Sequence, residues 1–299
     1  SAASVSVFSN KLVEDRYEMG SILKALTMAA GLDSGAVTRK TTFNDPGCKT
    51  LDKKTFCNFD KKSYGTKVPM QLVLSKSLNT GAAFVVEKMG NSQFRDYMFS
   101  YGLASTTGVD LPNEGKSLVS NLSVPRDLEY AQASFGQGVA FTPIQMVRAL
   151  SVLANGGYLI TPHLVKKIDY ELGITKDVTP PKGKQIFKAG TTEEISRMLT
   201  EVVDTALRDG KVRLDKYSVA AKTGTAQIAN PAGGGYFADH YLHSFFGYFP
   251  SYDAKFLVFL YTFHPLGVQY ATETLTDSFI NLTKFLINYY NIPPDREMP

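Results

Sequence analysis

The order of its secondary-structure patterns is the feature that most constrains the fold of this 299-residue chain. Helical patterns, with apolar residues recurring every three or four positions, dominate as far as Gly210. Patterns typical of β-strands are gathered after it, at 219–226, 244–249 and 256–263, before a last amphipathic helix over about 274–290. The order predicts an α+β protein, in which a mostly helical lobe over 21–210 lies beside a sheet lobe with a C-terminal helix over 211–299.

Local signals set the expected elements of the helical lobe. Gly20 directly precedes Ser21 and places this serine at or near a helix start, while Pro143 fits the first turn of a later helix. A glycine-rich loop is expected at 231–235, between the first two strands. We expect helices over 21–32, 68–78, 80–88, 91–101, 142–154 and 191–208, with a turn at 77–79 and a loop over 107–112.

Composition excludes several classes of function. The net charge of +4 is small for this length, and basic residues cluster only as dipeptides, so no nucleic-acid partner is indicated. No stretch approaches the roughly 18 to 20 apolar residues that cross a bilayer. The opening SAASVSVFSNKL also lacks the basic start and apolar core of a signal peptide. The chain is therefore expected to be either cytosolic or a soluble piece of a longer protein.

The two cysteines, Cys48 and Cys57, bracket a segment that looks like two short strands around a turn at 51–54. In such a hairpin the two thiols lie opposite each other, close enough for a disulfide. Two reduced thiols are the alternative. A disulfide would indicate folding in an oxidising compartment. A zinc site is not indicated, because no histidine lies near in sequence.

Three short motifs carry the candidate chemistry: S-x-x-K from Ser21 to Lys24, S-x-N at 77–79 and K-T-G-T at 222–225. A serine hydroxyl is a poor nucleophile unless a base lies within hydrogen-bond reach. Positions i and i+3 of a helix share a face, so Lys24 is expected to accept the proton of Ser21. The helix start also directs its positive dipole end at a developing anion. Ser21 is therefore the candidate nucleophile and Lys24 its base.

Lys24 must be neutral to act as a base, although the reference pKa of lysine is about 10.4. The ammonium of Lys222 would lower the pKa of Lys24, because two charges about 4 Å apart repel by about 4 kcal/mol at an effective dielectric constant near 20. Burial acts in the same direction. One lysine would then be the base, while the other stays charged and binds an anionic group of the substrate.

The remaining motif residues suit the recognition of a peptide. Gly224 would let a substrate backbone approach the strand closely. The hydroxyls of Thr223 and Thr225 are expected to bind a carboxylate, and the Thr225 N–H to complete an oxyanion hole with that of the nucleophile. Ser77 is expected to relay a proton to the leaving amine, and Asn79 to hold a peptide amide. A turn residue at Ser77 and a helix cap at Asn79 are the alternatives.

Around these motifs, and over essentially its whole length, the chain resembles the transpeptidase domain of class B penicillin-binding proteins, the monofunctional type of high molecular mass. Met19 stands where the family usually has proline, which is expected to loosen the turn before the nucleophile. The segments that carry the resemblance are Y-E-M-G-S at 17–21, S-L-N-T-G at 77–81, T-G-V-D-L-P at 107–112, S-F-G-Q-G at 134–138, T-P at 142–143 and K-T-G-T-A-Q at 222–227.

The resemblance implies a penicillin-binding-protein/β-lactamase-like fold, with an antiparallel sheet covered by helices, in one transpeptidase domain over 1–299. It implies a peptidoglycan D,D-transpeptidase without metal or cofactor, which forms an acyl-serine intermediate with D-Ala-D-Ala stem peptides and is acylated by β-lactams. It also implies an extracytoplasmic location and partners among other cell-wall synthesis proteins. Family members carry a membrane helix, a pedestal domain and about two strands before the nucleophile, so we expect a membrane-anchored full-length protein.

Two other functions stay open. A D,D-carboxypeptidase or β-lactamase would resolve the acyl-enzyme with water, but the E-x-x-L-N segment of the best-known hydrolytic type is absent between the second and third motifs. A sensor or an inactive fragment would bind β-lactam or muropeptide without turnover. The three intact motifs favour catalysis.

Two further patterns are set aside. Gly115-Lys116-Ser117 resembles the end of a P-loop, but Asp110 stands where the first glycine is required. The run D-H-x-x-H at 239–243 lacks a third metal ligand. Its histidines, His240 and His243, are expected to face solvent, with lining of the substrate groove as the alternative.

Overall fold

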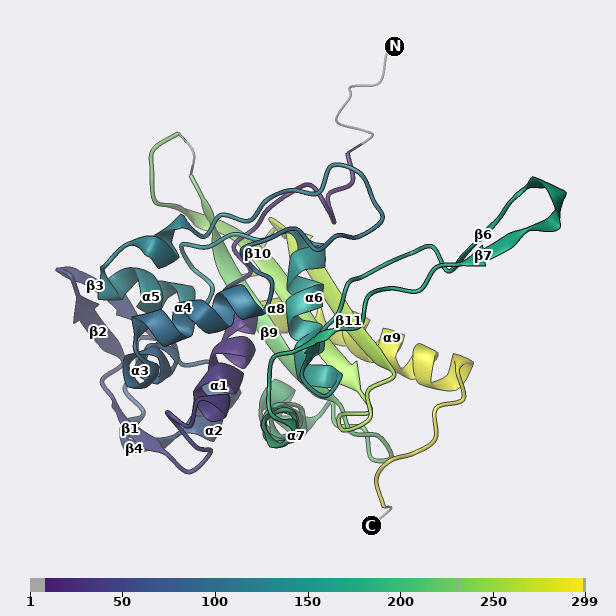
Figure 1. Ribbon diagram of the computed structural model, residues 1–299. Helices are drawn as coiled ribbons and strands as arrows, with labels where there is room; N and C mark the ends of the chain where they lie inside the picture. The colour runs from purple at the N-terminus through teal and green to yellow at the C-terminus, as the bar shows by residue number, and fades with distance from the viewer. Residues whose placement is uncertain (1–8, 231, 298–299) are drawn as a thin grey trace.

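The computed structural model describes residues 9–230 and 232–297 (Figure 1). Residues 1–8 of the chain's opening, residues 298–299, and Pro231 of the predicted glycine-rich loop lie outside these ranges. Within the described ranges, a three-stranded antiparallel sheet is covered by helices on both faces. The α+β fold class predicted from the order of the patterns is confirmed.

The sheet consists of β9 (Ala220–Ala229), β10 (Tyr236–Phe249) and β11 (Phe256–Phe263), in the order β11-β10-β9. The sequence predicts all three strands, and β11 has the predicted bounds. β10, however, begins at Tyr236 and not at 244 as predicted. Its first residues are half-buried or exposed and include Asp239 and His240, so they lack the apolar pattern of a buried strand.

Side chains alternate between the two faces of the sheet, so each face contributes to a different part of the core. Phe245 and Phe249 point toward α9 (Thr276–Tyr289), where Phe279 stacks on Phe245 with ring centroids 4.4 Å apart. Phe246 and its neighbours on the other face pack against the helices that precede the sheet in sequence. A short helix, α8 (Ala271–Thr274), connects β11 to α9.

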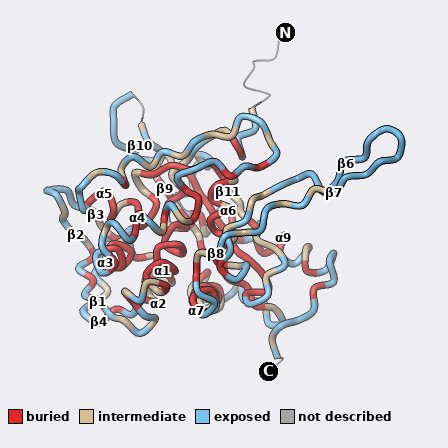
Figure 2. The backbone as a smooth tube through the Cα atoms, viewed as in Figure 1, coloured by how far each residue is buried: buried red, intermediate tan, exposed pale blue. Residues whose placement is uncertain are grey.

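The helix α1 (Leu23–Asp33) lies in the middle of the buried region (Figure 2). All of its residues except Leu32 are buried, and small side chains let it pack closely: a Cβ at Gly31 would lie 2.5 Å from a methyl carbon of Val85. A 3-10 turn, η2 (Gly20–Ile22), leads into it. The other helices of this part are α2 (Met70–Ser75), α3 (Asn79–Met89), α4 (Asn91–Ser100), η3 (Ser120–Ser123), α5 (Asp127–Ala133), α6 (Pro143–Ala154) and α7 (Ala189–Glu201), which continues as η5 (Val202–Ala206) and η6 (Leu207–Gly210).

The helical part also contains short strand pairs. The predicted helix over 68–78 is wrong at both ends, because Val68 and Pro69 belong to a strand and the helix spans only Met70–Ser75. Val68 precedes Pro69, and the residue before a proline is restricted to extended backbone. The pairs are β1 (Thr42–Asp45) with β4 (Gly65–Pro69), β2 (Cys48–Leu51) with β3 (Lys54–Cys57), β5 (Tyr158–Leu159) with β8 (Lys184–Gln185), and β6 (Lys167–Asp169) with β7 (Thr175–Asp177).

The β6–β7 hairpin, with the turn η4 (Glu171–Gly173), extends away from the rest of the molecule (Figure 1). Asp110 of the T-G-V-D-L-P segment holds its base, because its two carboxylate oxygens accept hydrogen bonds from the N–H groups of Leu164 and Val165, each at 2.8 Å. These hydrogen bonds lower the pKa of the Asp110 carboxyl. In the described ranges, no helix combines the length and the apolar character that crossing a bilayer requires.

We expect Phe279→Ala to lower the free energy of unfolding by about 3 to 5 kcal/mol, because the substitution opens a cavity between α9 and the sheet. Phe285→Ala on the same helix is the control, since the Phe285 side chain is 57% exposed, and it should cost less than about 1 kcal/mol. Urea unfolding of the two variants measures both values. Equal losses would contradict this account of the core.

Candidate active site

A cleft of about 810 Å³ lies between β9, at one edge of the sheet, and the helical part. Segments that are far apart in sequence meet here. Its walls include five of the predicted site residues: Ser21, Ser77, Asn79, Thr223 and Thr225. The two lysines of the motifs lie beneath them, and the structure therefore brings all three motifs together.

The amine of Lys24 lies at the centre of these motifs. Its Nζ is 3.0 Å from Ser21 Oγ, 3.1 Å from Ser77 Oγ and 2.5 Å from the carbonyl oxygen of Ser77. A neutral amine has two N–H donors and one lone pair. It can donate to the two oxygens of Ser77 while its lone pair accepts the Ser21 proton, so the geometry suits a base.

Lys222 lies on the other side of Ser77. Its Nζ donates to Ser77 Oγ at 3.0 Å and to the carbonyl oxygen of Thr223 at 2.9 Å. The hydroxyl of Ser77 therefore bridges the two amines. Both lysine side chains are buried, with 1% and 3% of Lys24 and Lys222 exposed.

Burial lowers the pKa of both amines. Desolvation lowers the pKa of Lys24 well below its usual value, and repulsion by Lys222 lowers it further. Desolvation lowers the pKa of Lys222 to about 7. Both causes favour a neutral amine at Lys24, which is the state that a base requires.

Ser77 and Asn79 are held by the short turn between α2 and α3. Ser77 has a φ of +56°, a left-handed conformation that directs both of its oxygens at Lys24. Asn79 begins α3 but does not cap it; its Nδ2 donates to the carbonyl oxygen of Cys57 at 2.8 Å. The helix-cap interpretation of Asn79 is therefore wrong, because its amide binds the β2–β3 hairpin.

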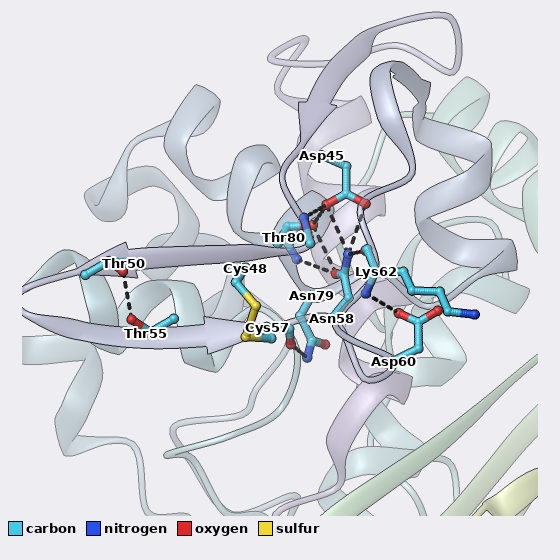
Figure 3. Close-up of a disulfide and its surroundings, with 11 residues drawn as sticks. Asp45, Cys48, Thr50, Thr55, Cys57, Asn58, Asp60, Lys62, Asn79 and Thr80 are labelled. Carbon is cyan, nitrogen blue, oxygen red and sulfur yellow. Dashed lines mark hydrogen bonds between the residues drawn. A yellow bond between two sulfur atoms is a disulfide. The ribbon is translucent and has the colours of Figure 1, made fainter.

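A bond between its two cysteines closes the β2–β3 hairpin. Cys48 and Cys57 are directly opposite each other in the β2–β3 register, as the sequence predicts, and a bond joins their sulfur atoms (Figure 3). Beyond Cys57, the backbone lines the cleft as far as Phe59. The hairpin thus supplies one wall of the site and a partner for Asn79.

A buried carboxylate, Asp45, ties these segments together (Figure 3). It accepts hydrogen bonds from Thr80 Oγ1 at 2.7 Å, from Asn58 Nδ2 at 3.0 Å and from the backbone N–H groups of Gly47 and Tyr64. Thr80 follows Asn79 directly. A full set of partners makes a buried carboxylate tolerable and orders the groups around it. The sequence analysis missed Asp45, since one acidic residue at the end of the short strand β1 carries no pattern.

The turn before Ser21 is held by close backbone contacts. Gly20 has a φ of +63° and Gly136 a φ of +85°, and a Cβ on Gly136 would lie 2.2 Å from the Gly20 carbonyl oxygen. The side chain of Met19 is fully buried, and its carbonyl oxygen accepts a hydrogen bond from Ser244 Oγ at 2.8 Å. The turn is thus fixed by its neighbours without the proline that the family usually has.

Alternation along β9 separates its motif residues. Thr223 and Thr225 are half-buried and face the cleft, whereas Lys222 and Gly224 point inward. The predicted role of Gly224 needs correction: a Cβ there would lie 2.4 Å from Ser244 Oγ and 2.7 Å from the Met19 carbonyl oxygen. The missing side chain therefore makes room for the contact behind the strand, and not for a substrate. Thr225 Oγ1 also accepts a hydrogen bond from the Ala271 N–H at 3.1 Å.

One of the two histidines of β10, His243, differs from the prediction. His243 is buried, with its ring nitrogens 2.9 Å from Thr274 Oγ1 and 3.0 Å from the carbonyl oxygen of Gln269. Burial lowers its pKa. The expectation that it faces solvent is wrong, because its position in β10 points it at the β11–α8 segment. In the described ranges, no group of three or more potential ligands is arranged to hold a metal.

Comparison with known proteins agrees with the site. Residues 2–280 match the family model described as the penicillin binding protein transpeptidase domain. The chain belongs to the penicillin-binding protein transpeptidase family. The resemblance to class B members, identified from the motifs, is confirmed by relatives that carry the names of such proteins.

Three relatives of this chain illustrate the match. Stage V sporulation protein D of Bacillus subtilis is 31% identical, and the match covers 88% of this chain and 41% of that protein. Penicillin-binding protein PbpB of Mycolicibacterium smegmatis is 26% identical, and the match covers 97% of this chain and 46% of that protein. The peptidoglycan D,D-transpeptidase FtsI homolog of Mesostigma viride is 27% identical, and the match covers 96% of this chain and 52% of that protein. The chain spans about half the length of the curated relatives it matches.

Solved structures of penicillin-binding proteins have the same fold. Penicillin binding protein 3 of Mycobacterium tuberculosis, crystallised with aztreonam, superposes with a TM-score of 0.87 at 25% identity, covering 96% of this chain and 66% of that one. The complex of the same protein with ampicillin gives a TM-score of 0.88. The predicted penicillin-binding-protein fold is confirmed.

We expect Gly136→Ala to lower the rate of acylation by a penicillin on the order of 100-fold, because the new Cβ would displace Gly20 and with it the hydroxyl of Ser21. Gly35→Ala is the matched control: Gly35 has a φ of +75°, but nothing lies within 4 Å of its added Cβ. Both variants carry the backbone strain of a left-handed alanine. Stopped-flow acylation compares them, and similar rates would exclude the positioning role of Gly136.

Proposed function

We propose that this chain is a peptidoglycan D,D-transpeptidase that acts through an acyl-serine intermediate at Ser21. One observation carries the proposal: Lys24 Nζ lies 3.0 Å from Ser21 Oγ, is buried, and has a pKa lowered by burial and by Lys222. A neutral amine at this distance is what activation of a serine requires. The names of the relatives, several of which are called peptidoglycan D,D-transpeptidases, support the same reaction.

In the acylation step, Lys24 Nζ accepts the proton of Ser21 while Ser21 Oγ bonds to the carbonyl carbon of the penultimate D-Ala. The carbonyl oxygen becomes an anion, which the N–H groups of Ser21 and Thr225 would stabilise. The carbon–nitrogen bond to the last D-Ala then breaks. A proton reaches the leaving amine through the hydroxyl of Ser77, which lies within 3.1 Å of Lys24 Nζ.

In the transfer step, an amine of a second stem peptide attacks the ester carbonyl, and its proton returns to Ser21 by the same route.

Before acylation, the terminal carboxylate of the donor would be bound by Lys222 and by the hydroxyls of Thr223 and Thr225. Asn79 would hold a peptide amide with the part of its side chain that the Cys57 carbonyl leaves free. β-Lactams would react with the same serine as analogues of the donor.

The wider role of the protein follows from its substrate. Peptidoglycan lies outside the cytoplasm, so we place the chain on the extracytoplasmic side of the bacterial inner membrane, as part of a membrane-anchored protein. Its partners would be other cell-wall synthesis proteins. The bonded pair Cys48 and Cys57 is in keeping with an oxidising compartment.

Intact-mass spectrometry after incubation with a penicillin tests the proposal. We expect one stable adduct on the unaltered chain, mapping to Ser21, and none on Ser21→Ala, because the alanine has no nucleophile. Circular dichroism of the variant checks that the fold is intact. An undiminished adduct on Ser21→Ala would refute the assigned nucleophile, and an adduct that decays within seconds would indicate a hydrolase.

We expect Lys222→Gln to move the acidic limb of the acylation–pH profile to higher pH. Acylation requires neutral Lys24, so its rate rises as pH increases through the pKa of that amine. Removing the charge at 222 removes a cause that lowers this pKa, and the pKa therefore rises. The measurement is the acylation rate by a fluorescent penicillin from pH 5 to 10. A limb that stays in place, or moves to lower pH, would contradict the coupling of the two lysines.

A further inference from the structure

The end of β9 beyond Gln227 pairs less regularly with β10 than the rest of the strand does. From Ala220 to Gln227, β9 pairs regularly with β10. The register then shifts, because Gln227 is opposite Tyr241 while Ala229 is opposite Tyr236. The extra residues of β10 interrupt the ladder, and pairing resumes only at Ala229 and Tyr236.

A side-chain contact adds to the pairing at this end. Tyr236 Oη donates to the carboxylate of Glu18, 2.9 Å from Oε2 and 3.2 Å from Oε1. Glu18 lies three residues before Ser21, in the turn that Gly20 and Met19 fix from the other sides. Partial burial raises the pKa of the Glu18 carboxyl, while the hydrogen bonds from Tyr236 and from the Gly138 N–H favour its charged form. One hydrogen bond thus connects the outer end of β9 and β10 to the segment that carries the nucleophile.

The direction in which a donor peptide would run along β9 gives the hydrogen bond between Tyr236 and Glu18 a role. If the donor carboxylate binds at Lys222 and Thr223, the donor chain must leave toward Gln227, because Ala220 and Ala221 at the other end are buried. A peptide added to the edge of β9 in the antiparallel sense runs in this direction. The stem residue that precedes D-Ala-D-Ala then lies against the cleft wall at Gln227 and Tyr236.

We propose that Tyr236 is a positioning residue. Its hydrogen bond to Glu18 holds the outer half of the donor-binding edge of β9, near Gln227, in a fixed position relative to Ser21. This role rests on the proposed function, since it concerns the same donor. It makes the acylation step sensitive to the length of the donor. A donor with a stem residue before D-Ala-D-Ala uses the outer half, whereas an acetylated D-Ala-D-Ala dipeptide ends before it.

The test compares these two donors as thioester analogues and follows the acyl-enzyme by rapid-quench mass spectrometry. We expect Tyr236→Phe to raise the KM of the longer donor about fivefold relative to that of the dipeptide, with kcat little changed, as for the loss of one hydrogen bond to a charged group. Tyr252→Phe is the matched control, because Tyr252 is exposed and lies outside the cleft. This control should leave the ratio of the two KM values unchanged.

A double-mutant cycle assigns the effect to the contact itself. Glu18→Ala should raise the KM of the longer donor relative to that of the dipeptide as much as Tyr236→Phe does, and the double variant should raise it no further. Glu18→Gln keeps an acceptor oxygen and should return this KM ratio most of the way to its value in the unaltered chain. Faster amide exchange over residues 228–238 in Tyr236→Phe is a second readout, independent of activity.

The outcomes separate this proposal from the proposed function. Equal KM ratios in Tyr236→Phe and the unaltered chain overturn the positioning role alone, as do fully additive losses in the double variant. Absence of any acyl-enzyme in the unaltered chain overturns both. A common fall in kcat for both donors would also overturn the role, because it would indicate a displaced nucleophile.

Discussion

Two buried amines that share one hydroxyl group are the constraint on which the structure depends. The Nζ atoms of Lys24 and Lys222 both lie within 3.1 Å of Ser77 Oγ, and both side chains are almost inaccessible to water. Burying one ammonium is costly, and burying two beside each other costs more, so at least one proton must leave. The proposed reactivity of the site and its electrostatic strain therefore have the same origin. The surrounding fold must be stable enough to hold both amines in place.

Much of that fold can be understood as the means of keeping the three motifs together. Ser21 comes from a helix start in the core, Ser77 from a left-handed turn, and Lys222 from a strand at the sheet edge. No two of these elements are continuous in sequence. The Asp45 network and the closed β2–β3 hairpin fix the turn that carries Ser77, and the contact behind Gly224 fixes the strand against the segment that carries Ser21.

The sequence predicted those features that leave a local pattern. Periodicity gave α6 and β11, and the motif spacing identified the residues that meet in the cleft. Features that depend on distant partners were missed or misread. Asp45 is an ordinary acidic residue at the end of a short strand until four segments converge on it, and the small size of Gly224 looks suited to a substrate until the Met19–Ser244 contact behind it is known. His243 likewise reads as a polar surface residue, although the sheet turns it inward.

The contact between Gly20 and Gly136 has a consequence for how this protein can change over generations. Backbone meets backbone there, and each glycine is already the smallest residue, so no substitution at either position can tune the contact gradually. The turn before Ser21 is therefore mutationally rigid. Variation that alters ligand binding would have to accumulate on the cleft walls, at side chains such as Phe59 and Tyr270, which both line the cleft and meet edge to face with ring centroids 4.8 Å apart.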